Sequence, residues 1–271
     1  MTAPAGGRRN GMRFLIAGLV LLALGHARPA GAAPGGPVLV ELFTSQGCSS
    51  CPPAERFLGQ LPAHGFGRDK VIPLTFHVDY WDHLGWPDPF ASPQWTARQA
   101  WYARAGRLRP AGGHGGISGL YTPQMIVNGQ THFPGGQTDV ALRELAAAGS
   151  RMRPIALGLR AQVSRDEVRV TVDLPAGVAL PARADWRLTI ALVQKSARTQ
   201  VLHGENGGET LEETALVRAL SPPLSVAGRR VEASLRWPAD LARANAGLVA
   251  FIQSDATGEV AAVAALDVLP P

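Results

Sequence analysis

The chain is poor in cysteine, since its 271 residues contain only two, Cys48 and Cys51. Two thiols are too few for a four-thiolate zinc site or an iron–sulfur cluster, so sulfur chemistry rests on this pair. The spacing Cys-x-x-Cys sets the thiols one helical turn apart, where they can close a small disulfide and reopen it by exchange. A static structural staple is the alternative, although a bridge over so short a loop restrains little chain entropy.

Other functional signatures are also missing. No run of lysine or arginine remains beyond the N-terminal segment, so nothing indicates a nucleic-acid partner. Ser45 and Ser118 stand in no G-x-S-x-G context, which removes support for a hydrolase. The apolar run from Phe14 to Leu24 is too short to span a bilayer comfortably. We also find no internal repeat.

The N-terminus has the three parts of a secretory signal. Arg8, Arg9 and Arg13 precede or begin the apolar run, and Ala30-Gly31-Ala32 supplies an A-x-A cleavage signal. We therefore predict a signal peptide over residues 1–32 and a periplasmic or secreted mature chain, with an uncleaved anchor as the alternative. Cleavage removes four arginines and no acid, so the formal net charge falls from +5 to +1. Disulfides persist in such compartments.

The hydrophobic pattern changes period near residue 150, which predicts two domains. Before it, segments typical of strands and helices alternate. The expected strands are 38–43, 71–80, 124–127 and 131–133, and the expected helices are 54–61, 92–105 and 139–148, the last capped by Thr138 and ended by Gly149. Asn128-Gly129 is a strong hairpin signal. Beyond Arg151, apolar residues alternate with a period of two, so we expect residues 151–271 to form an antiparallel β-sandwich.

The order strand, Cys-x-x-Cys, helix, strand and then Thr122-Pro123 before a hairpin resembles the thioredoxin superfamily. More narrowly, the segments GCSSCPPA, FHVDYWDHLGWPDPF and GENGGETL are similar to those of secreted bacterial thioredoxin-like proteins catalogued as a domain of unknown function. The resemblance implies an α/β thioredoxin-like domain over residues 36–150, with a mixed sheet flanked by helices. It also implies a cis peptide before Pro123 and an inserted helix and loop, roughly Trp81 to Gly119, near the active face.

The same resemblance assigns roles to five residues. Cys48 would be an exposed nucleophile just ahead of a helix whose dipole stabilises its thiolate, and Cys51, one turn inside, the buried resolving thiol. Thr122 would offer backbone hydrogen bonds to an extended substrate, and Pro123 would keep a free N–H away from the sulfurs. Glu41 is similar to the buried acid that moves the resolving thiol's proton, offset by one residue. Alternatively, Glu41 points into a polar notch and bonds backbone.

A second group of chemically active residues follows the strand expected at 71–80. His77, Asp79, Asp82 and His83 provide two imidazoles and two carboxylates that could bind zinc or copper, with or without the thiolates. Their spacing matches no ligand pattern known to us. A polar network that anchors the inserted segment is the alternative.

Two further features are expected to be ordinary surface structure. Gly204-Glu205-Asn206-Gly207-Gly208 has the composition of a turn, and no nucleophile–base pair stands near it. His114, in a glycine-rich loop, and His132, in the hairpin, are expected to be surface residues.

Together these patterns predict an exported thiol–disulfide oxidoreductase. It would exchange a Cys48–Cys51 disulfide with envelope protein thiols and disulfides, with no soluble cofactor, no nucleic acid and no membrane span once the signal is removed. Whether it acts as oxidant, reductant or isomerase stays open. The first alternative is a metal-binding or metal-delivery protein that uses Cys48, Cys51 and His77. The second is a non-catalytic adaptor whose β-domain binds a protein while the disulfide stiffens the loop.

Overall fold

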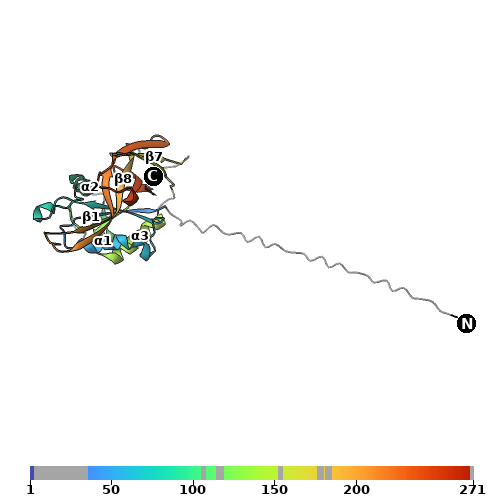
Figure 1. The fold of residues 1–271 in the computed structure, drawn as a ribbon, viewed down its shortest axis with the longest axis horizontal. Helices are drawn as coiled ribbons and strands as arrows, with labels where there is room; N and C mark the ends of the chain where they lie inside the picture. Colours follow the sequence, from blue (N-terminus) through green and yellow to red (C-terminus); the bar gives the residue numbers. More distant parts are fainter. Residues whose placement is uncertain are drawn as a thin grey trace. The chain divides into compact units, whose positions relative to one another are not determined.

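The computed structural model describes residues 1–2, 36–104, 108–113, 119–151, 155–175, 180 and 185–268. Contacts along the chain divide it into two units, Met1–Ala32 and Ala33–Pro271. The described residues of the second unit are drawn as helices and strands in Figure 1. Most of the predicted signal peptide and the predicted surface residue His114 lie outside the described residues. Within the described ranges, no helix is both long enough and apolar enough to cross a membrane.

Three α-helices and thirteen strands make up the described part of the second unit. The helices are α1 (Pro52–Gly59), α2 (Pro93–Arg104) and α3 (Thr138–Arg151), with short 3-10 turns at Leu61–His64, Asp82–Leu84, Ala111–Gly113 and Arg243–Asn245. The strands are β1 (Val38–Thr44), β2 (Val71–His77), β3 (Arg109–Pro110), β4 (Gln124–Val127), β5 (Thr131–Pro134), β6 (Gly158–Val163), β7 (Glu167–Asp173), β8 (Trp186–Gln200), β9 (Thr210–Leu220), β10 (Leu224–Ser225), β11 (Arg230–Arg236), β12 (Ala246–Ser254) and β13 (Val260–Asp267).

One sheet runs through both halves of the sequence. Its order is β13-β12-β8-β9-β2-β1-β4-β5-β3, with β10 attached to β8. The halves meet where β2 pairs in parallel with β9, at Thr75 and Leu216, and the Thr75 hydroxyl donates to the Thr214 carbonyl over 2.6 Å. The boundary predicted at residue 150 therefore does not separate two compact units, because this shared sheet holds Ala33–Pro271 in one.

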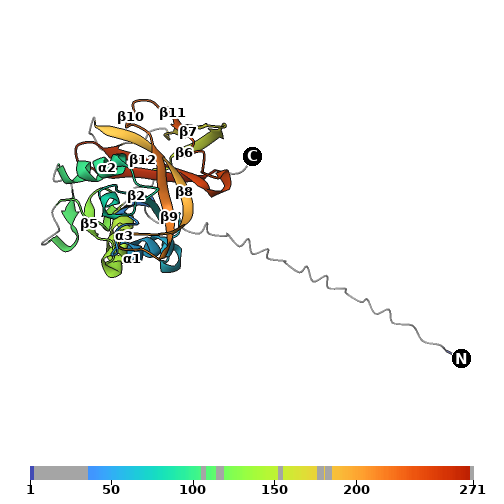
Figure 2. The same cartoon turned by 60° about the vertical axis from the view of Figure 1, so that its left-hand side comes forward.

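The central strands are covered on both faces, because successive strand side chains point to opposite sides. Val38, Val40 and Leu42 of β1 pack against α1 and α3. Leu39 and Phe43 face the other way, into a cluster with α2 and β12. Figure 2 shows α1 and α3 together on one side of the central strands and α2 beside β12 on the other. Successive residues of β1 therefore enter different apolar clusters, on opposite faces of the sheet.

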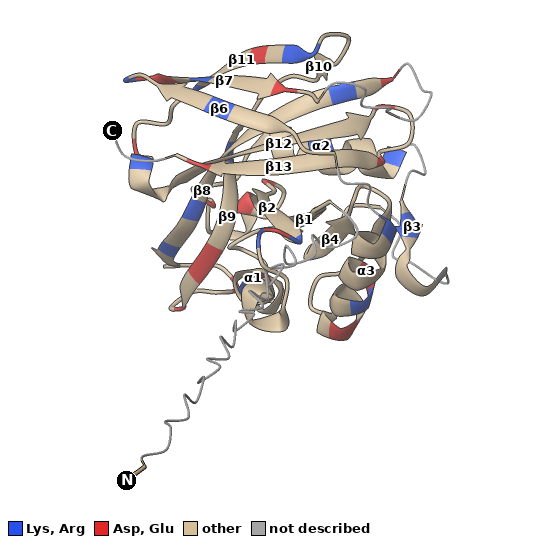
Figure 3. Cartoon of the chain, turned by 90° about the vertical axis from the view of Figure 1, so that its right-hand side faces the viewer, with Lys and Arg blue, Asp and Glu red and all other residues tan. Residues whose placement is uncertain are grey.

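A three-stranded antiparallel sheet, β11-β7-β6, forms a further layer. Figure 3 shows it above β12 and β13. The valines of β7 alternate with polar residues and enter one apolar cluster with Leu188 and Ile190 of β8 and with Leu248 of β12. Alternation with a period of two therefore forms two packed antiparallel layers in this half of the chain.

Local signals placed most element ends near their observed positions. In the hairpin between β4 and β5, Asn128 and Gly129 have φ angles of 48° and 63°, the left-handed values that a type I′ turn requires. Several expected ends were wrong. The helix predicted over 54–61 spans Pro52–Gly59. The helix predicted to stop at Gly149 continues to Arg151, and the strand predicted to reach Tyr80 ends at His77. Gly149 has no left-handed φ, so it does not end the helix in the way a C-terminal glycine does.

Candidate functional site

Cys48 and Cys51 form a disulfide, with their Cα atoms 5.4 Å apart. Both residues are fully buried, whereas Ser49 and Ser50 between them are exposed. The expectation of an exposed Cys48 is therefore wrong for this oxidised state. Cys51 caps the N-terminus of α1 instead of lying one turn inside it, and its carbonyl accepts the N–H of Ala54 over 2.9 Å. Prolines follow it in the first turn, where backbone donors have no helical partner.

The Thr122–Pro123 peptide bond is cis, as the resemblance implied. Pro123 is buried close to the start of α1. A Cβ atom placed on Gly135 would lie 3.3 Å from the Pro123 Cβ and 2.9 Å from the Ala54 Cβ, so this glycine permits the close approach of all three segments. The cis peptide and the helix that follows the disulfide therefore meet in one place.

Trp81, from the predicted inserted segment, joins the cis peptide to the loop before Cys48. Its indole N–H donates to the Thr122 hydroxyl over 2.9 Å. Its Cβ atom would lie 3.2 Å from a Cβ placed on Gly47, so a side chain at that position would force the two segments apart. The inserted segment, which contains α2 as expected for a helix, thus contributes Trp81 to the surroundings of the disulfide.

Glu41 does not join this site. Its carboxylate binds the Arg98 guanidinium over 2.6 Å, and it also accepts a hydrogen bond from the Tyr102 hydroxyl. Both partners come from α2, on the sheet face opposite α1, because side-chain alternation along β1 turns Glu41 away from Val40 and Leu42. Glu41 is part of a buried ion pair. The assignment of Glu41 to the resolving thiol is therefore wrong, and so is the alternative in which it bonds backbone in a polar notch.

A buried polar cluster instead lies beneath the cysteine loop. Its members are Thr44, Gln46, Glu55, His77, Asp88 and Glu213. His77 Nδ1 lies 2.7 Å from Asp88 Oδ2, and that same oxygen accepts the Gln46 N–H over 2.8 Å. The Gln46 side chain donates to Glu213 over 2.6 Å and accepts the Trp86 indole N–H over 2.9 Å. The backbone just before Cys48 is therefore anchored on buried charges.

Burial and mutual attraction shift the pKa values in this cluster. Burial alone would lower the pKa of His77, but the negative charges of Asp88, Glu213 and Glu55 raise it to about 9. Burial raises the pKa of Glu55 to about 7, against the opposing effects of the His77 charge and a hydrogen bond from Thr44. Burial also raises the pKa of Glu213. For Asp88, the His77 charge and several hydrogen bonds overcome burial and lower the pKa.

The Gly-Glu-Asn-Gly-Gly segment, expected to be an ordinary turn, contacts the cysteine loop. The Ser49 N–H donates to the Glu205 carboxylate over 3.0 Å. The Asn206 amide donates to the carbonyls of Gln46, over 2.8 Å, and of Cys48, over 3.0 Å. The turn prediction is confirmed by the backbone, yet the side chains hold the loop that carries the disulfide.

The four residues considered for metal binding do not form a metal site. His77 is paired with Asp88, whereas the Asp79 carboxylate accepts the Thr96 hydroxyl and His83 is exposed. Across the described ranges, no three His, Cys, Asp or Glu side chains are grouped so that they could hold a metal ion.

His132, expected on the surface, is buried. Its Nδ1 atom lies 2.9 Å from the Tyr121 hydroxyl, and burial lowers its pKa. The reason is that β5 is enclosed between β4 and β3 in the sheet.

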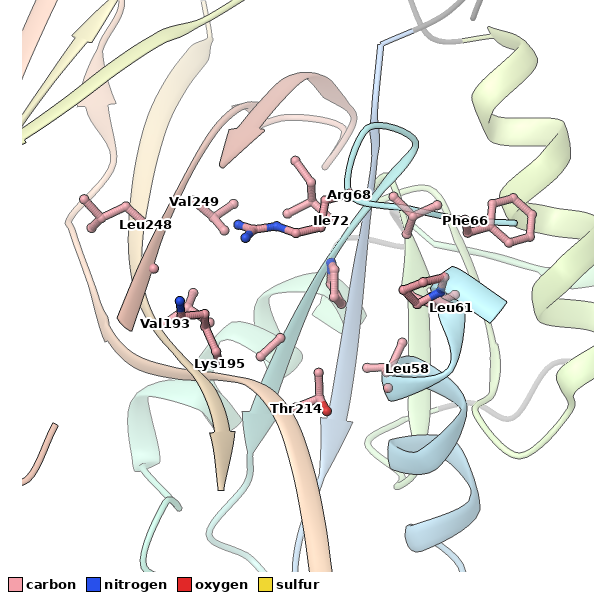
Figure 4. A pocket seen from close by; sticks show the side chains of 16 residues that line it. Leu58, Leu61, Phe66, Arg68, Ile72, Val193, Lys195, Thr214, Leu248 and Val249 are labelled. Atoms are coloured by element: carbon pink, nitrogen blue, oxygen red, sulfur yellow. The ribbon is translucent and has the colours of Figure 1, made fainter. Parts of the chain in front are cut away.

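The apolar cavity in Figure 4 lies apart from this chemistry. Its volume is about 220 Å³, and aliphatic side chains of α1, β2, β8 and β12 line much of it, including Leu58, Ile72, Val193 and Val249. Neither cysteine lines it. Its charged lining residues, Arg68 and Lys195, both lie close to Asp267, so the cavity provides no catalytic pair.

Sequence reasoning missed several residues of the site. Glu55 could have been found, since it follows Cys51 by four residues and so shares its side of the helix. Asp88 and Asn206 lie in two of the segments that carry the family resemblance, but nothing in the sequence tied them to the cysteines, and Glu213 had no signal. Asn206 and Glu213 come from the other half of the chain, and only the shared sheet brings them to the cysteine loop.

Comparison with known proteins identifies a family and several similar solved structures, two of which are compared with this chain. The family described as "Protein of unknown function (DUF1223)" matches residues 39–253. The crystal structure of protein AGR_C_4864 from Agrobacterium tumefaciens is 25% identical, covers 88% of this chain and 96% of its own, and has a TM-score of 0.58. HBP35 of Porphyromonas gingivalis is 11% identical, with 88% and 77% covered and a TM-score of 0.60, so it shows the fold alone. No curated protein matches the chain.

Proposed function

The chain belongs to the DUF1223 family, and because that family is described as of unknown function, we propose from the geometry of the chain itself that it exchanges the Cys48–Cys51 disulfide with protein thiols and disulfides. One observation carries the proposal: the disulfide immediately precedes α1, and the cis Thr122–Pro123 peptide packs near the start of that helix. A staple would need neither the cis peptide nor the buried titratable cluster beside it. The wider proposal is that residues 36–150 form a thioredoxin-like unit. The parallel β1–β2 pair and the β4–β5 hairpin after Pro123 support it.

The exchange step balances without a cofactor. When a partner dithiol reduces the protein, a partner thiolate bonds to Sγ of Cys48, and the S–S bond breaks with its electron pair leaving on Cys51. The Cys51 thiolate then takes up a proton. The second partner thiol loses its proton and attacks the partner sulfur of the mixed disulfide, which releases Cys48 as a thiolate. Two electrons have passed to this chain, and the reverse sequence oxidises a partner.

Glu55 is the group that we assign to the proton of Cys51. The two residues are one helical turn apart on α1, and the Glu55 N–H donates to the Cys51 carbonyl over 3.3 Å. The carboxyl is buried, and its pKa of about 7 lets it give or take a proton near neutral pH. The positive charge of His77 stabilises the ionised form of Glu55, and the contact of His77 with Asp88 holds the end of β2 in place.

We place this exchange in the bacterial envelope. The support is the predicted signal peptide, together with the fact that disulfides form and persist in oxidising compartments. Envelope proteins that carry thiols or disulfides are then the partners.

Trapping a mixed disulfide tests the function. In the full chain, Cys51→Ala leaves Cys48 able to attack a partner but unable to release it, so covalent adducts that disappear on reduction should accumulate on non-reducing gels. The matched control is the variant that also carries Cys48→Ala, in which no adduct can form. If Cys51→Ala traps nothing while the double variant still copurifies with partners, the protein is an adaptor and the exchange proposal is wrong.

A further inference from the structure

A loop from the C-terminal half of the chain covers the cysteine loop. Residues 202–208, which we name the capping loop, connect β8 to β9. Gly204 and Gly208 have left-handed φ angles of 78° and 93°, and the Gly208 N–H donates to the Val201 carbonyl over 2.8 Å. The two glycines and this hydrogen bond form a tight turn. It presents Glu205 and Asn206 to the segment that holds the disulfide.

The two side chains bind that segment differently. Asn206 is buried and neutral, and it holds the carbonyls of Gln46 and Cys48. Glu205 is exposed, and its carboxylate accepts the N–H of Ser49, the first backbone donor after Cys48. Hydrogen bonds from the Ser49 side chain and from its backbone N–H lower the pKa of Glu205, so it is ionised at neutral pH. Asn206 therefore positions the loop, whereas Glu205 also brings a charge.

We propose that Glu205 is a positioning residue that disfavours the thiolate of Cys48 and so makes the Cys48–Cys51 pair more reducing. The inference rests on the proposed function. In the disulfide both sulfurs are neutral, and the carboxylate is tolerated. After reduction, a thiolate at Cys48 would lie next to Ser49, whose backbone N–H is already bound to the Glu205 carboxylate. The negative charge then opposes the thiolate, and one backbone donor that could stabilise it is occupied.

The direction of the effect follows from linkage between the thiolate and the disulfide. Any interaction that stabilises the thiolate stabilises the reduced form and makes a pair more oxidising. Glu205 acts in the opposite sense, so its removal should favour the reduced form. Because the carboxylate is exposed, dissolved salt should screen the effect.

Other charged groups surround the cysteine loop, and burial and neighbouring charges shift their pKa values too. Glu55 approaches from α1, His77 from β2, Glu213 from β9, and Asp82 and Asp88 from the segment between β2 and α2. A single pH profile would mix their effects with that of Glu205. A comparison between variants that leave all five unchanged removes this problem.

The experiment compares Glu205→Gln with Glu209→Gln. Glutamine keeps a carbonyl oxygen for the Ser49 N–H and removes only the charge, and Glu209 is an exposed acid just beyond the same loop. The first readout is the rate of Cys48 alkylation against pH in a Cys51→Ala background. The second is the equilibrium of the intact pair with reduced and oxidised glutathione.

Glu205→Gln should lower the apparent pKa of Cys48 and shift the glutathione equilibrium about threefold or more toward the reduced protein, an effect of about half a pKa unit. Glu209→Gln should change neither quantity. In the wild-type chain, 1 M salt should move the pKa of Cys48 toward that of Glu205→Gln, and this measurement needs no substitution at Glu205. The proposal is wrong if Glu205→Gln matches wild type, if Glu209→Gln shifts the values equally, or if salt has no effect.

Failure of the proposed function would look different. In that case Cys51→Ala would trap no partner, while the alkylation profile of Cys48 would still report whether Glu205 opposes its thiolate. If partners are trapped and Glu205→Gln leaves both readouts unchanged, only the role of Glu205 is lost.

Discussion

Asp88→Asn should destabilise the protein in a way that depends on pH. Asp88 and His77 are both almost fully buried, and their side chains meet over 2.7 Å. Asparagine has one side-chain oxygen for the N–H groups of Gln46 and Phe90 that the Asp88 carboxylate now accepts, and it leaves the His77 imidazolium without its nearest negative charge. A buried charge that loses its partner is strongly destabilising.

The pKa of His77 gives the sign and the size of the effect. Its folded value of about 9 lies above the model value of 6.5, so protonated His77 contributes stability that is fully present below about pH 6.5. That contribution is lost as the pH rises through about 9. A shift of this size corresponds to up to about 3 kcal/mol. We therefore expect Asp88→Asn to cost about 3 kcal/mol more at pH 7 than at pH 10.

Urea unfolding of the oxidised protein, followed by tryptophan fluorescence at pH 7 and pH 10, measures this difference. Glu55, whose pKa is about 7, also titrates between these pH values, so the quantity compared is the difference between wild type and Asp88→Asn at each pH. In a His77→Gln background, Asp88→Asn should cost the same at pH 7 and pH 10, because there is no imidazolium to strand. An equal cost of Asp88→Asn at pH 7 and pH 10 would refute the reasoning.

Three further predictions test other parts of the structure. Glu55→Gln should remove a step near pH 7 from the pH profile of disulfide reduction by a dithiol, whereas an unchanged profile would show that this carboxyl does not serve the sulfurs. Arg98→Met should cost about 3–5 kcal/mol in urea unfolding, because it strands the buried Glu41 carboxylate, and adding Glu41→Gln should recover part of the loss. Gly129→Ala should lower the melting temperature more than Gly65→Ala. Both glycines have positive φ, but only at Gly129 would a Cβ atom overlap a neighbouring carbonyl oxygen, that of Gly258. Equal melting temperatures of the two variants would contradict this.

Local sequence signals were sufficient for the parts of the protein that local physics determines. The Cys-x-x-Cys pair, the helix after it and the Asn128-Gly129 turn depend on spacing and on backbone preferences within a few residues. Alternation with a period of two marked β6 and β7 because each buries one face. The same rules failed at Gly149, where packing carries the helix past a residue that often ends one.

The composition of the site was decided by tertiary structure. The sequence could not show that β9 joins β2, and this pairing brings Glu213 and the capping loop to cysteines more than 150 positions earlier in the chain. It also could not show which face of β1 looks toward α1, so Glu41 was assigned to the thiols although it lies on the opposite face, paired with Arg98. Both outcomes have one physical reason. Long-range strand pairing and the choice of a buried face depend on how the whole core packs, and no short stretch of sequence carries that information.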